Sequence, residues 1–295
     1  MRIRRNDSPN VLKSSFLKIT ILFALVSAII LVSAYGSYLF FANEMLNHER
    51  EDLQSLGKMK AERINDLLNN CHSDTNIFIA RSSVWKTLMA IDAVEEARRL
   101  TKAITNMLQS GKNYRRILVV DMAFQLVAPT ISHRFEPIEL SALREAVKTR
   151  DFVLVDLHRI EDGVIVYGAA HPVFANDDSN GAVVGAVYFE RAAQQDLFPL
   201  LELESTSSYS LETLIARQEG NDILFLSPLR FKPDASPLSF RMSINNYQTL
   251  AGNALVRGQF GLVTGHDYHG NDVIGTTRAV PGTPWVMITK RRIQP

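Results

Sequence analysis

The most constraining feature of this sequence is a stretch of 25 residues, 19–43, that contains no Asp, Glu, Lys or Arg. As a helix rising about 1.5 Å per residue it would be about 37 Å long, longer than the ~30 Å hydrocarbon core of a membrane. Aromatic side chains cluster near its far end, where an aromatic belt would lie at the second membrane–water interface: Tyr35, Tyr38, Phe40 and Phe41. The stretch is therefore predicted to be a transmembrane helix.

The residues that precede this stretch predict its orientation. Five arginines and lysines but only one acidic residue, Asp7, lie before position 19. Because cytoplasmic flanks carry such an excess, residues 1–18 are expected in the cytoplasm and the chain after about residue 43 on the other side. A cleavable signal peptide is the alternative, but its apolar region is normally about 7–15 residues long and ends at small residues. This stretch is longer, and Ala-Tyr-Gly-Ser-Tyr followed by Leu-Phe-Phe is a poor cleavage site, so an uncleaved anchor is favoured.

Residues 44–70 are predicted to form an amphipathic helix directly after the span. They contain no proline and carry apolar residues at spacings of three, four and seven. The apolar stripe has two interpretations: it covers the core of its own chain, or it forms a parallel seam with a second copy. Lys60 falls on the seam and makes the heptad imperfect, so the sequence leaves both open. Another helix is predicted over residues 93–108.

Beyond Gly111 the pattern changes to short strands separated by turn residues. The strands of the first run are predicted at 116–121, 124–128, 152–158, 164–174 and 182–190, with a helix at 139–149. After a helix at 192–204, a second run has strands at 210–218, 223–226, 261–267, 272–280 and 285–290, with a helix at 245–256. Short hairpin links imply antiparallel sheets with helices on one side. The predicted fold class is α+β, with two tandem antiparallel-sheet modules after the long helix.

Composition and motifs exclude several classes of protein. Lys and Arg number 32 and Asp and Glu 31, so the charge gives no reason to expect nucleic-acid binding. A single cysteine, Cys71, excludes intrachain disulfides and cysteine-rich metal centres. The sequence has no phosphate loop, dinucleotide fingerprint, nucleophile elbow, or kinase or cyclase signature. His266 and His269 could ligate a metal, but a hairpin turn explains them and is favoured. We expect neither catalysis within this chain nor a cofactor.

Four segments, 163–174, 181–190, 212–230 and 270–290, resemble the double Cache sensor domains of bacterial membrane receptors. Residues 163–174 and 181–190 are similar to a strand, a turn and a Gly-x-x-x-Gly-x-x-x-x-Asp return strand in the membrane-distal module of that family. Residues 270–290 contain a Val-Pro-Gly-Thr-x-Trp step, similar to the closing hairpin of the membrane-proximal module. Residues 212–230 are similar to sensor regions that precede histidine kinases and diguanylate cyclases.

This resemblance implies two PAS-like modules of the double Cache fold and a division of the whole chain. The expected parts are a cytoplasmic N-terminus 1–18, a span 19–43, a signalling helix region 44–110, a distal module 111–191, a proximal module 192–292, and the start of a second span at 293–295. Members of the family return through the membrane to a cytoplasmic output module. The sequence contains no second apolar span, so either the parent protein continues beyond residue 295 or its gene is truncated, and the first is favoured.

A ligand pocket is expected over the sheet of the distal module, as in Cache sensors. Strand alternation places Tyr167 and His171 on one face, and Glu190 lies on the neighbouring strand. Arg116 and His158 would close the pocket, and the guanidinium offers a fork for a carboxylate. The competing interpretation is favoured for any single position, namely that these are half-buried or solvent-facing sheet residues.

The sequence departs from the amino-acid-binding members of the family at two points. Glu190 stands where many members place the Asp that binds a ligand amine, and their Tyr/Arg/Trp/Tyr constellation is absent from the sequence. The ligand class therefore stays open, with carboxylates among those expected. In the proximal module the polar candidates are Tyr209, Arg217 and Arg230, for which a structural role is favoured.

The sequence thus predicts the extracytoplasmic sensor region of a bacterial receptor, anchored in the cytoplasmic membrane. Its expected partners are a small-molecule ligand, the membrane and a second copy bound through the long helix, with no nucleic acid. A histidine kinase or diguanylate cyclase is the expected output. The alternatives are a membrane-anchored periplasmic enzyme, and a structural or protein-sensing Cache module whose pocket is occluded.

Overall fold

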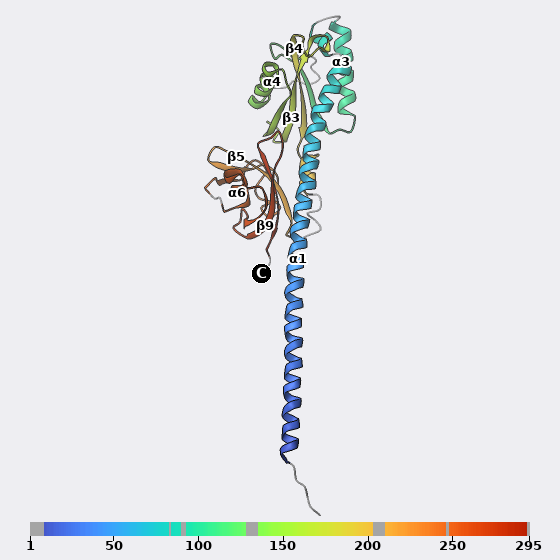
Figure 1. Ribbon diagram of the computed structural model, residues 1–295. Helices are drawn as coiled ribbons and strands as arrows, with labels where there is room; N and C mark the ends of the chain where they lie inside the picture. Colours follow the sequence, from blue (N-terminus) through green and yellow to red (C-terminus); the bar gives the residue numbers. More distant parts are fainter. Residues whose placement is uncertain are drawn as a thin grey trace, which may run out of the picture. The chain divides into compact units, whose positions relative to one another are not determined.

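A computed structural model of the chain describes residues 9–82, 84–89, 93–127, 135–202, 210–245 and 248–293 (Figure 1). The chain divides into two compact units, Met1–Asp52 and Leu53–Pro295, and the helix α1 (Pro9–Ser82) runs through the boundary. In the first unit the segment Thr20–Phe41 has a mean hydropathy of 2.0, and none of it is buried. This helix is long and apolar enough to cross a membrane.

The part of α1 that belongs to the second unit buries one face. Leu53, Gly57, Lys60, Ile64 and Leu68 are buried at spacings of three and four residues. Ile64 and Leu68 join a hydrophobic cluster that contains residues of both sheets described below. The stripe therefore covers the core of its own chain, which is the first of the two interpretations.

The first module is built on a four-stranded antiparallel sheet in the order β1-β4-β3-β2. Its strands are β1 (Tyr114–Asp121), β2 (Val153–Arg159), β3 (Ile165–Phe174) and β4 (Val183–Ala192). Its helices are α2 (Val84–Leu88), α3 (Ala93–Leu108), α4 (Pro137–Thr149) and the 3-10 turn η1 (Ala175–Asp177). The expected helix at 139–149 and four of the five expected strands are close to the observed elements.

Helices cover both faces of this sheet, so the expectation of helices on one side is wrong. Apolar residues of α1 and α3 pack on one face, and those of α4 pack on the other (Figure 1). The reason is visible in the strands, because β3 and β4 are buried along almost their whole length instead of alternating between buried and exposed.

The strand expected at 124–128 is also wrong. The chain folds back at a turn in which Asp121 Oδ1 accepts hydrogen bonds from the backbone N–H groups of Ala123 (2.8 Å) and Gln125 (2.9 Å). Phe124 has a positive φ of 58°, and only Leu126 pairs with β1, as a single bridge to Val120. The last residue of the expected strand lies outside the described residues. A side-chain cap on the turn replaced the ladder that the sequence pattern predicted.

The second module is built on a six-stranded antiparallel sheet in the order β7-β6-β5-β10-β9-β8. Its strands are β5 (Glu212–Glu219), β6 (Asp222–Phe225), β7 (Arg241–Ser243), β8 (Gly261–His266), β9 (Asp272–Ala279) and β10 (Trp285–Arg292). Its helices are α5 (Leu197–Glu202), which leads into it, and α6 (Leu250–Arg257). The predicted α+β architecture with two antiparallel-sheet modules is confirmed.

Two helices of this module are shorter than expected. The helix predicted at 192–204 begins only at Leu197, because β4 continues through Ala192, and residues 203–204 lie outside the described residues. The helix predicted at 245–256 begins after Thr249, whose Oγ1 accepts a hydrogen bond from Gly252 N (3.1 Å). The three-residue strand β7 was not predicted.

Gly57 lets α1 approach the second sheet closely. A Cβ atom added at this glycine would lie 2.2 Å from Thr276 Cγ2 on β9, nearer than any real contact. Thr276 is fully buried, so it has little room to move aside.

We predict that Gly57→Ala destabilises the chain by about 1–3 kcal/mol, although alanine favours a helix, because the methyl group overpacks the contact. Thr276→Ser removes Cγ2 and should restore most of the loss in the double variant. Thermal unfolding of the full chain in detergent measures both. Gly36→Ala is the matched control, since nothing lies within 4 Å of its added Cβ. Equal stability of Gly57→Ala and the natural chain would contradict the prediction.

Candidate functional site

The five predicted binding residues lie on two different faces of the first sheet. Glu190 is paired with Arg116 of β1 and with Gly168 of β3, whereas Tyr167 is paired with Arg191. Because paired residues share a face and neighbours along a strand alternate, Glu190 and Tyr167 point in opposite directions.

The register therefore sorts the five residues into two groups. Arg116, His158 and Glu190 lie on the face covered by α4, and Tyr167 and His171 lie on the face covered by α1. The structure brings three of the five together and separates the other two from them.

Tyr167 is a core residue of the α1 side. It is fully buried, and its hydroxyl donates a hydrogen bond to Asp196 Oδ1 (3.0 Å). Arg191 Nε donates to the other oxygen of Asp196 (2.6 Å) and its guanidinium lies 4.6 Å from the ring centre of Tyr114. Burial raises the pKa of Tyr167 well above its ordinary value, so it remains a neutral hydrogen-bond donor. The hydroxyl oxygen, the one polar atom of the Tyr167 side chain, is therefore hydrogen-bonded within the chain.

His171 lines a separate cavity of about 370 Å³ between α1 and the β3–β4 turn, together with Arg150 and Phe174. Its Nδ1 lies 2.8 Å from the carbonyl oxygen of Pro172, and its ring stacks against His72 at a centroid distance of 6.0 Å. Burial, together with the nearby His72, lowers the pKa of His171 despite the Pro172 contact. His171 is therefore a neutral imidazole near pH 7.

Glu190 is the centre of a buried polar cluster on the α4 side. Its Oε1 accepts hydrogen bonds from Arg115 Nη1 (2.6 Å) and Arg116 Nε (3.1 Å), and the side chain is fully buried. Arg115 is shared, because its Nη2 also donates to Asp162 (2.5 Å) at the exposed turn between β2 and β3. Two guanidinium groups thus hold one carboxylate oxygen and leave the other available.

His158 and Glu139 form the second part of this cluster. His158 Nδ1 lies 2.8 Å from the carbonyl oxygen of Asp156, and its Nε2 lies 3.6 Å from Glu139 Oε1. Glu139, in the first turn of α4, is fixed by its Oε2, which accepts from Glu136 N (2.9 Å). Burial lowers the pKa of His158, but the Glu139 side chain, the Asp156 carbonyl and the charge of Glu190 outweigh it, so the net pKa is raised.

Tyr188 completes the group, which we call the α4-side cluster: Arg116, Glu139, His158, Tyr188 and Glu190. Within the described part of the chain, the Tyr188 hydroxyl and Glu190 Oε2 are both buried and have no hydrogen-bond partner. Burial, and then the charges of Glu139 and Glu190, raise the pKa of Tyr188 well above its ordinary value. An unsatisfied buried polar group costs about 1–3 kcal/mol, and such groups normally find a partner in bound water or a ligand.

Sequence reasoning missed Arg115, Glu139 and Tyr188. Tyr188 could have been predicted from the sequence, since it lies two residues before Glu190 on the same strand and therefore on the same face. Glu139 carried only the weak signal of an acid in the first turn of a helix. Arg115 could not be distinguished from Arg116 without the irregularity that shifts the register of β1 between Tyr114 and Arg116.

The candidates of the second module have structural partners. Arg217 pairs with Asp156 of β2 through Nη1 and with Glu219 through Nη2 (2.9 Å), and Trp285 Nε1 donates to the same Asp156 (2.6 Å). These contacts join the two sheets through one carboxylate. Tyr209 lies outside the described residues.

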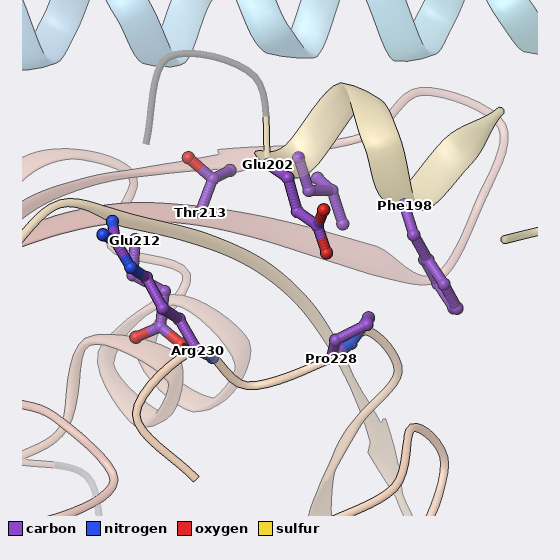
Figure 2. Close-up of a pocket in the computed structure, with 7 residues that line it drawn as sticks. Phe198, Glu202, Glu212, Thr213, Pro228 and Arg230 are labelled. Carbon is purple, nitrogen blue, oxygen red and sulfur yellow. Dashed lines mark hydrogen bonds between the residues drawn. The ribbon is translucent and has the colours of Figure 1, made fainter. Parts of the chain in front are cut away.

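Arg230 lines a cavity of about 220 Å³ whose other walls come from α5, from β5 and from Pro228 in the loop after β6 (Figure 2). Its Nη1 donates to the carbonyl oxygen of Leu211 (2.7 Å). The lining combines apolar side chains (Phe198, Leu201 and Pro228) with polar and charged ones (Glu202, Glu212, Thr213 and Arg230). Glu212 and Arg230, two of these polar groups, already make hydrogen bonds within the chain.

The two histidines considered as metal ligands have separate partners. His266 Nδ1 lies 3.1 Å from Asp272, and His269 Nε2 lies 2.9 Å from the carbonyl oxygen of Phe231. Among the residues that the structure describes, no group of three or more His, Cys, Asp and Glu side chains is placed to hold a metal ion.

Comparison with known proteins identifies structural neighbours only. No family model matches the sequence, and no curated protein matches it significantly. The sensory domain of the Campylobacter jejuni chemoreceptor CcmL is 10% identical, with a TM-score of 0.60 over 85% of this chain and 96% of that one. The ligand-binding domain of the Pseudomonas aeruginosa amino acid chemoreceptor PctB, in complex with L-arginine, is 15% identical, with a TM-score of 0.57 over 83% and 96%.

A third neighbour is the ligand-binding domain of the P. aeruginosa amino acid chemoreceptor PctC in complex with GABA. It is 10% identical, with a TM-score of 0.55 over 82% of this chain and 99% of that one. The chain covers nearly the whole of each neighbour, including both modules. The double Cache fold expected from the sequence resemblance is confirmed.

We predict that His158 makes stability depend on pH in a defined direction. Because its folded-state pKa is raised, its contribution is fully present below about pH 6.5 and is lost as the pH rises through the folded-state pKa. Urea unfolding of the full chain in detergent at pH 5.5 and 8.5 measures the free energy of unfolding at each pH. Between these two pH values the free energy of unfolding should fall less for His158→Gln than for the natural chain. The difference is about 1.4 kcal/mol for each unit by which the pKa is raised.

His171→Gln is the matched control, because the pKa of His171 is lowered and its sign is opposite. Its removal should relieve a loss of stability that develops as the pH falls below about 6.5. Parallel pH profiles for the two variants would contradict the assignment.

Proposed function

We propose that this chain is the extracytoplasmic ligand-sensing region of a bacterial membrane receptor, and that a small molecule binds the α4-side cluster of the first module. The single observation that carries the proposal is the pair of buried, unsatisfied polar atoms, Tyr188 OH and Glu190 Oε2. Two such atoms on one face, beside charged groups, are the arrangement expected of a site whose occupant supplies the missing hydrogen bonds.

The chemistry of the cluster favours a ligand with a protonated amine. Glu190 Oε2 would accept from an ammonium group, and Tyr188 would donate to or accept from a neighbouring polar atom. Arg116, already bound to Glu190, offers a positive charge for a ligand carboxylate. L-arginine and GABA, which the neighbouring domains of PctB and PctC hold, both carry an amine and a carboxylate. An amino acid or a related amine is therefore our first choice of ligand class.

The proposal places the chain in the cytoplasmic membrane. The apolar helical segment Thr20–Phe41 would be the anchor, and the basic residues before it would stay in the cytoplasm. The modules would then face the periplasm or the cell exterior, as the expected division into a distal part, 111–191, and a proximal part, 192–292, requires.

A signal would travel through α1. The segment of α1 after Leu53 packs on both sheets, so a structural change in the first module would alter the packing of the helix that leads to the membrane. A ligand shifts such an equilibrium only by its differential affinity for the two states. We propose a homodimer as the reader, since a helix shift is registered against a partner, and a histidine kinase or diguanylate cyclase as the output.

One observation favours the occluded alternative. Glu190 is already held by two arginines of its own chain, and in a protein-sensing or structural module these pairs would themselves fill the site. The enzyme alternative has no comparable support. Ligand binding at the cluster decides between the sensor and the occluded module.

We expect at least one amine or amino acid to raise the Tm of the full chain in a thermal-shift panel that also includes carboxylates, nucleobases and sugars. At about 100 times its Kd a ligand adds about 2.7 kcal/mol, which is a shift of several degrees. Glu190→Gln and Arg116→Ala should abolish the shift. Tyr167→Phe, on the other face, is the control and should retain it. A folded chain that responds to no compound would favour the occluded module.

Tyr188→Phe should separate stability from binding. Deleting a buried hydroxyl without a partner should leave the unliganded chain equally stable or stabilise it by about 1 kcal/mol. The same change should weaken the ligand about 10-fold, because one hydrogen bond is lost from the complex. Calorimetry with the compound found in the panel measures the second effect. A variant that loses stability yet binds normally would assign the hydroxyl a structural role.

A further inference from the structure

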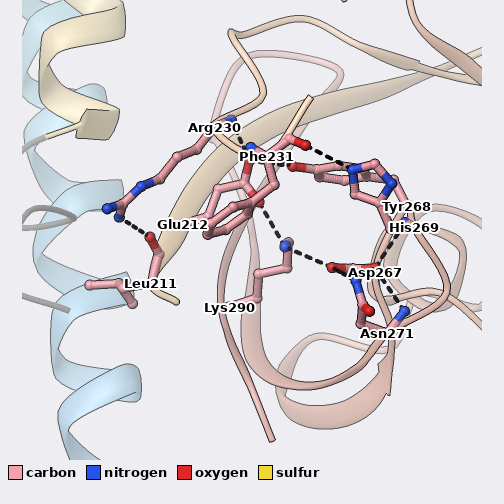
Figure 3. A network of polar contacts seen from close by, with 9 residues as sticks. All are labelled: Leu211, Glu212, Arg230, Phe231, Asp267, Tyr268, His269, Asn271 and Lys290. Atoms are coloured by element: carbon pink, nitrogen blue, oxygen red, sulfur yellow. Dashed lines mark hydrogen bonds and ion pairs between the residues drawn. The ribbon is translucent and has the colours of Figure 1, made fainter. Parts of the chain in front are cut away.

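The α6 side of the second sheet contains a buried ammonium group for which the proposed function has no role. Lys290 of β10 is 2% exposed, and its side chain points into the module (Figure 3). Around it lie Glu212 of β5, and Asp267 and Tyr268 of the turn after β8, the first two of them buried. We call these four residues the Lys290 network.

Carboxylates and aromatic rings surround this ammonium group together. Lys290 Nζ lies 2.7 Å from Glu212 Oε2 and 3.3 Å from Asp267 Oδ2. It also lies 4.8 Å from the ring centre of Tyr268 and 5.3 Å from that of Phe231. Negatively charged carboxylates and the faces of aromatic rings are the groups that proteins use to bind alkylammonium ligands.

Groups other than Lys290 hold the Glu212 acceptor in place. Glu212 Oε1 accepts hydrogen bonds from Tyr268 OH (2.7 Å) and from Arg230 N (2.8 Å). These bonds leave Oε2 turned toward the ammonium group. The carboxylate would keep this orientation without the lysine.

The Asp267 acceptor is held by its own turn. Its Oδ1 accepts from the backbone N–H groups of His269 (2.8 Å) and Asn271 (3.0 Å). Burial raises the pKa of Asp267, but the charge of Lys290 and these hydrogen bonds outweigh it, so the net pKa is lowered and the group is ionised near pH 7. The site is thus preorganised by backbone contacts.

Lys290 leaves almost no room for anything else. The space between the sheet and α6 that Asp267, Tyr268 and Lys290 line is about 10 Å³, the volume of a single water at most. The interior of the second module is therefore occupied by a side chain of its own last strand.

We propose that the second module contains a binding site for a primary alkylammonium group, and that the chain's own Lys290 is its permanent occupant. The site differs from an ordinary ion pair because its acceptors are fixed independently of the lysine. The occupant fastens β10 to β5 and to the turn after β8, and it makes an external ligand unnecessary in this module.

The test empties the site and offers a free occupant. Lys290→Ala in the full chain removes three carbons and the nitrogen, the atoms of n-propylammonium. We expect the Tm to fall by at least about 5 °C and to recover by at least half, saturably, at about 100 mM n-propylammonium chloride. Tetramethylammonium and sodium chloride at equal ionic strength are the matched controls, because neither cation has an N–H donor. Equal recovery with either control would overturn the proposal.

Two further variants keep the proposal falsifiable. Lys290→Ala combined with Asp267→Asn should lose the saturable response, and a retained response would overturn the proposal. Should Lys290→Ala fail to fold, Lys290→Met keeps the volume and leaves both carboxylates without their cation. Its deficit in Tm relative to the natural chain should narrow as the pH falls from 7 to 4, because protonation removes the uncompensated charges. A deficit independent of pH would overturn the proposal.

Discussion

The apolar face of one helix is the constraint on which the rest of the second unit depends. Ile64 and Leu68 of α1 lie in a single hydrophobic cluster with Tyr167 of the first sheet and with Trp285 and Met287 of the second. Neither sheet buries this side without the helix, so the two modules share a core although each has its own set of hydrogen-bonded strands. Their coupling is a consequence of burial, the dominant favourable term in folding.

The buried polar groups around this core are accommodated differently in three places. On the α1 side of the first sheet the polar atoms of Tyr167, Arg191 and Asp196 bind one another, as expected where apolar packing dominates. The α4 side instead retains buried atoms without partners, and the second module places an ammonium group where its interior would otherwise be hollow. Three solutions to the burial of charge thus occur in one chain, and on the α4 side a hydroxyl and a carboxylate oxygen are left with hydrogen bonds to be made.

Most of the fold could be predicted because turn residues and short apolar runs mark the strands, and because a resemblance supplied their arrangement. The site could be predicted only in part. Alternation correctly placed Tyr167 and His171 on one face of β3, but the face of Glu190 depends on its pairing with Gly168. A shift of one residue reverses that face, and register is set by turns and irregularities that composition does not reveal. The irregularity of β2 between Val155 and His158 is such a feature.

That irregularity in β2 also has an evolutionary consequence. Within three residues it turns His158 toward the α4-side cluster and leaves Asp156 bound to Arg217 and Trp285 of the second sheet. An insertion or deletion of one residue there would alter the cluster and the contact between modules in a single event. A chimera of two related chains would therefore keep both only where its β2 matches the strands that carry Arg217 and Trp285.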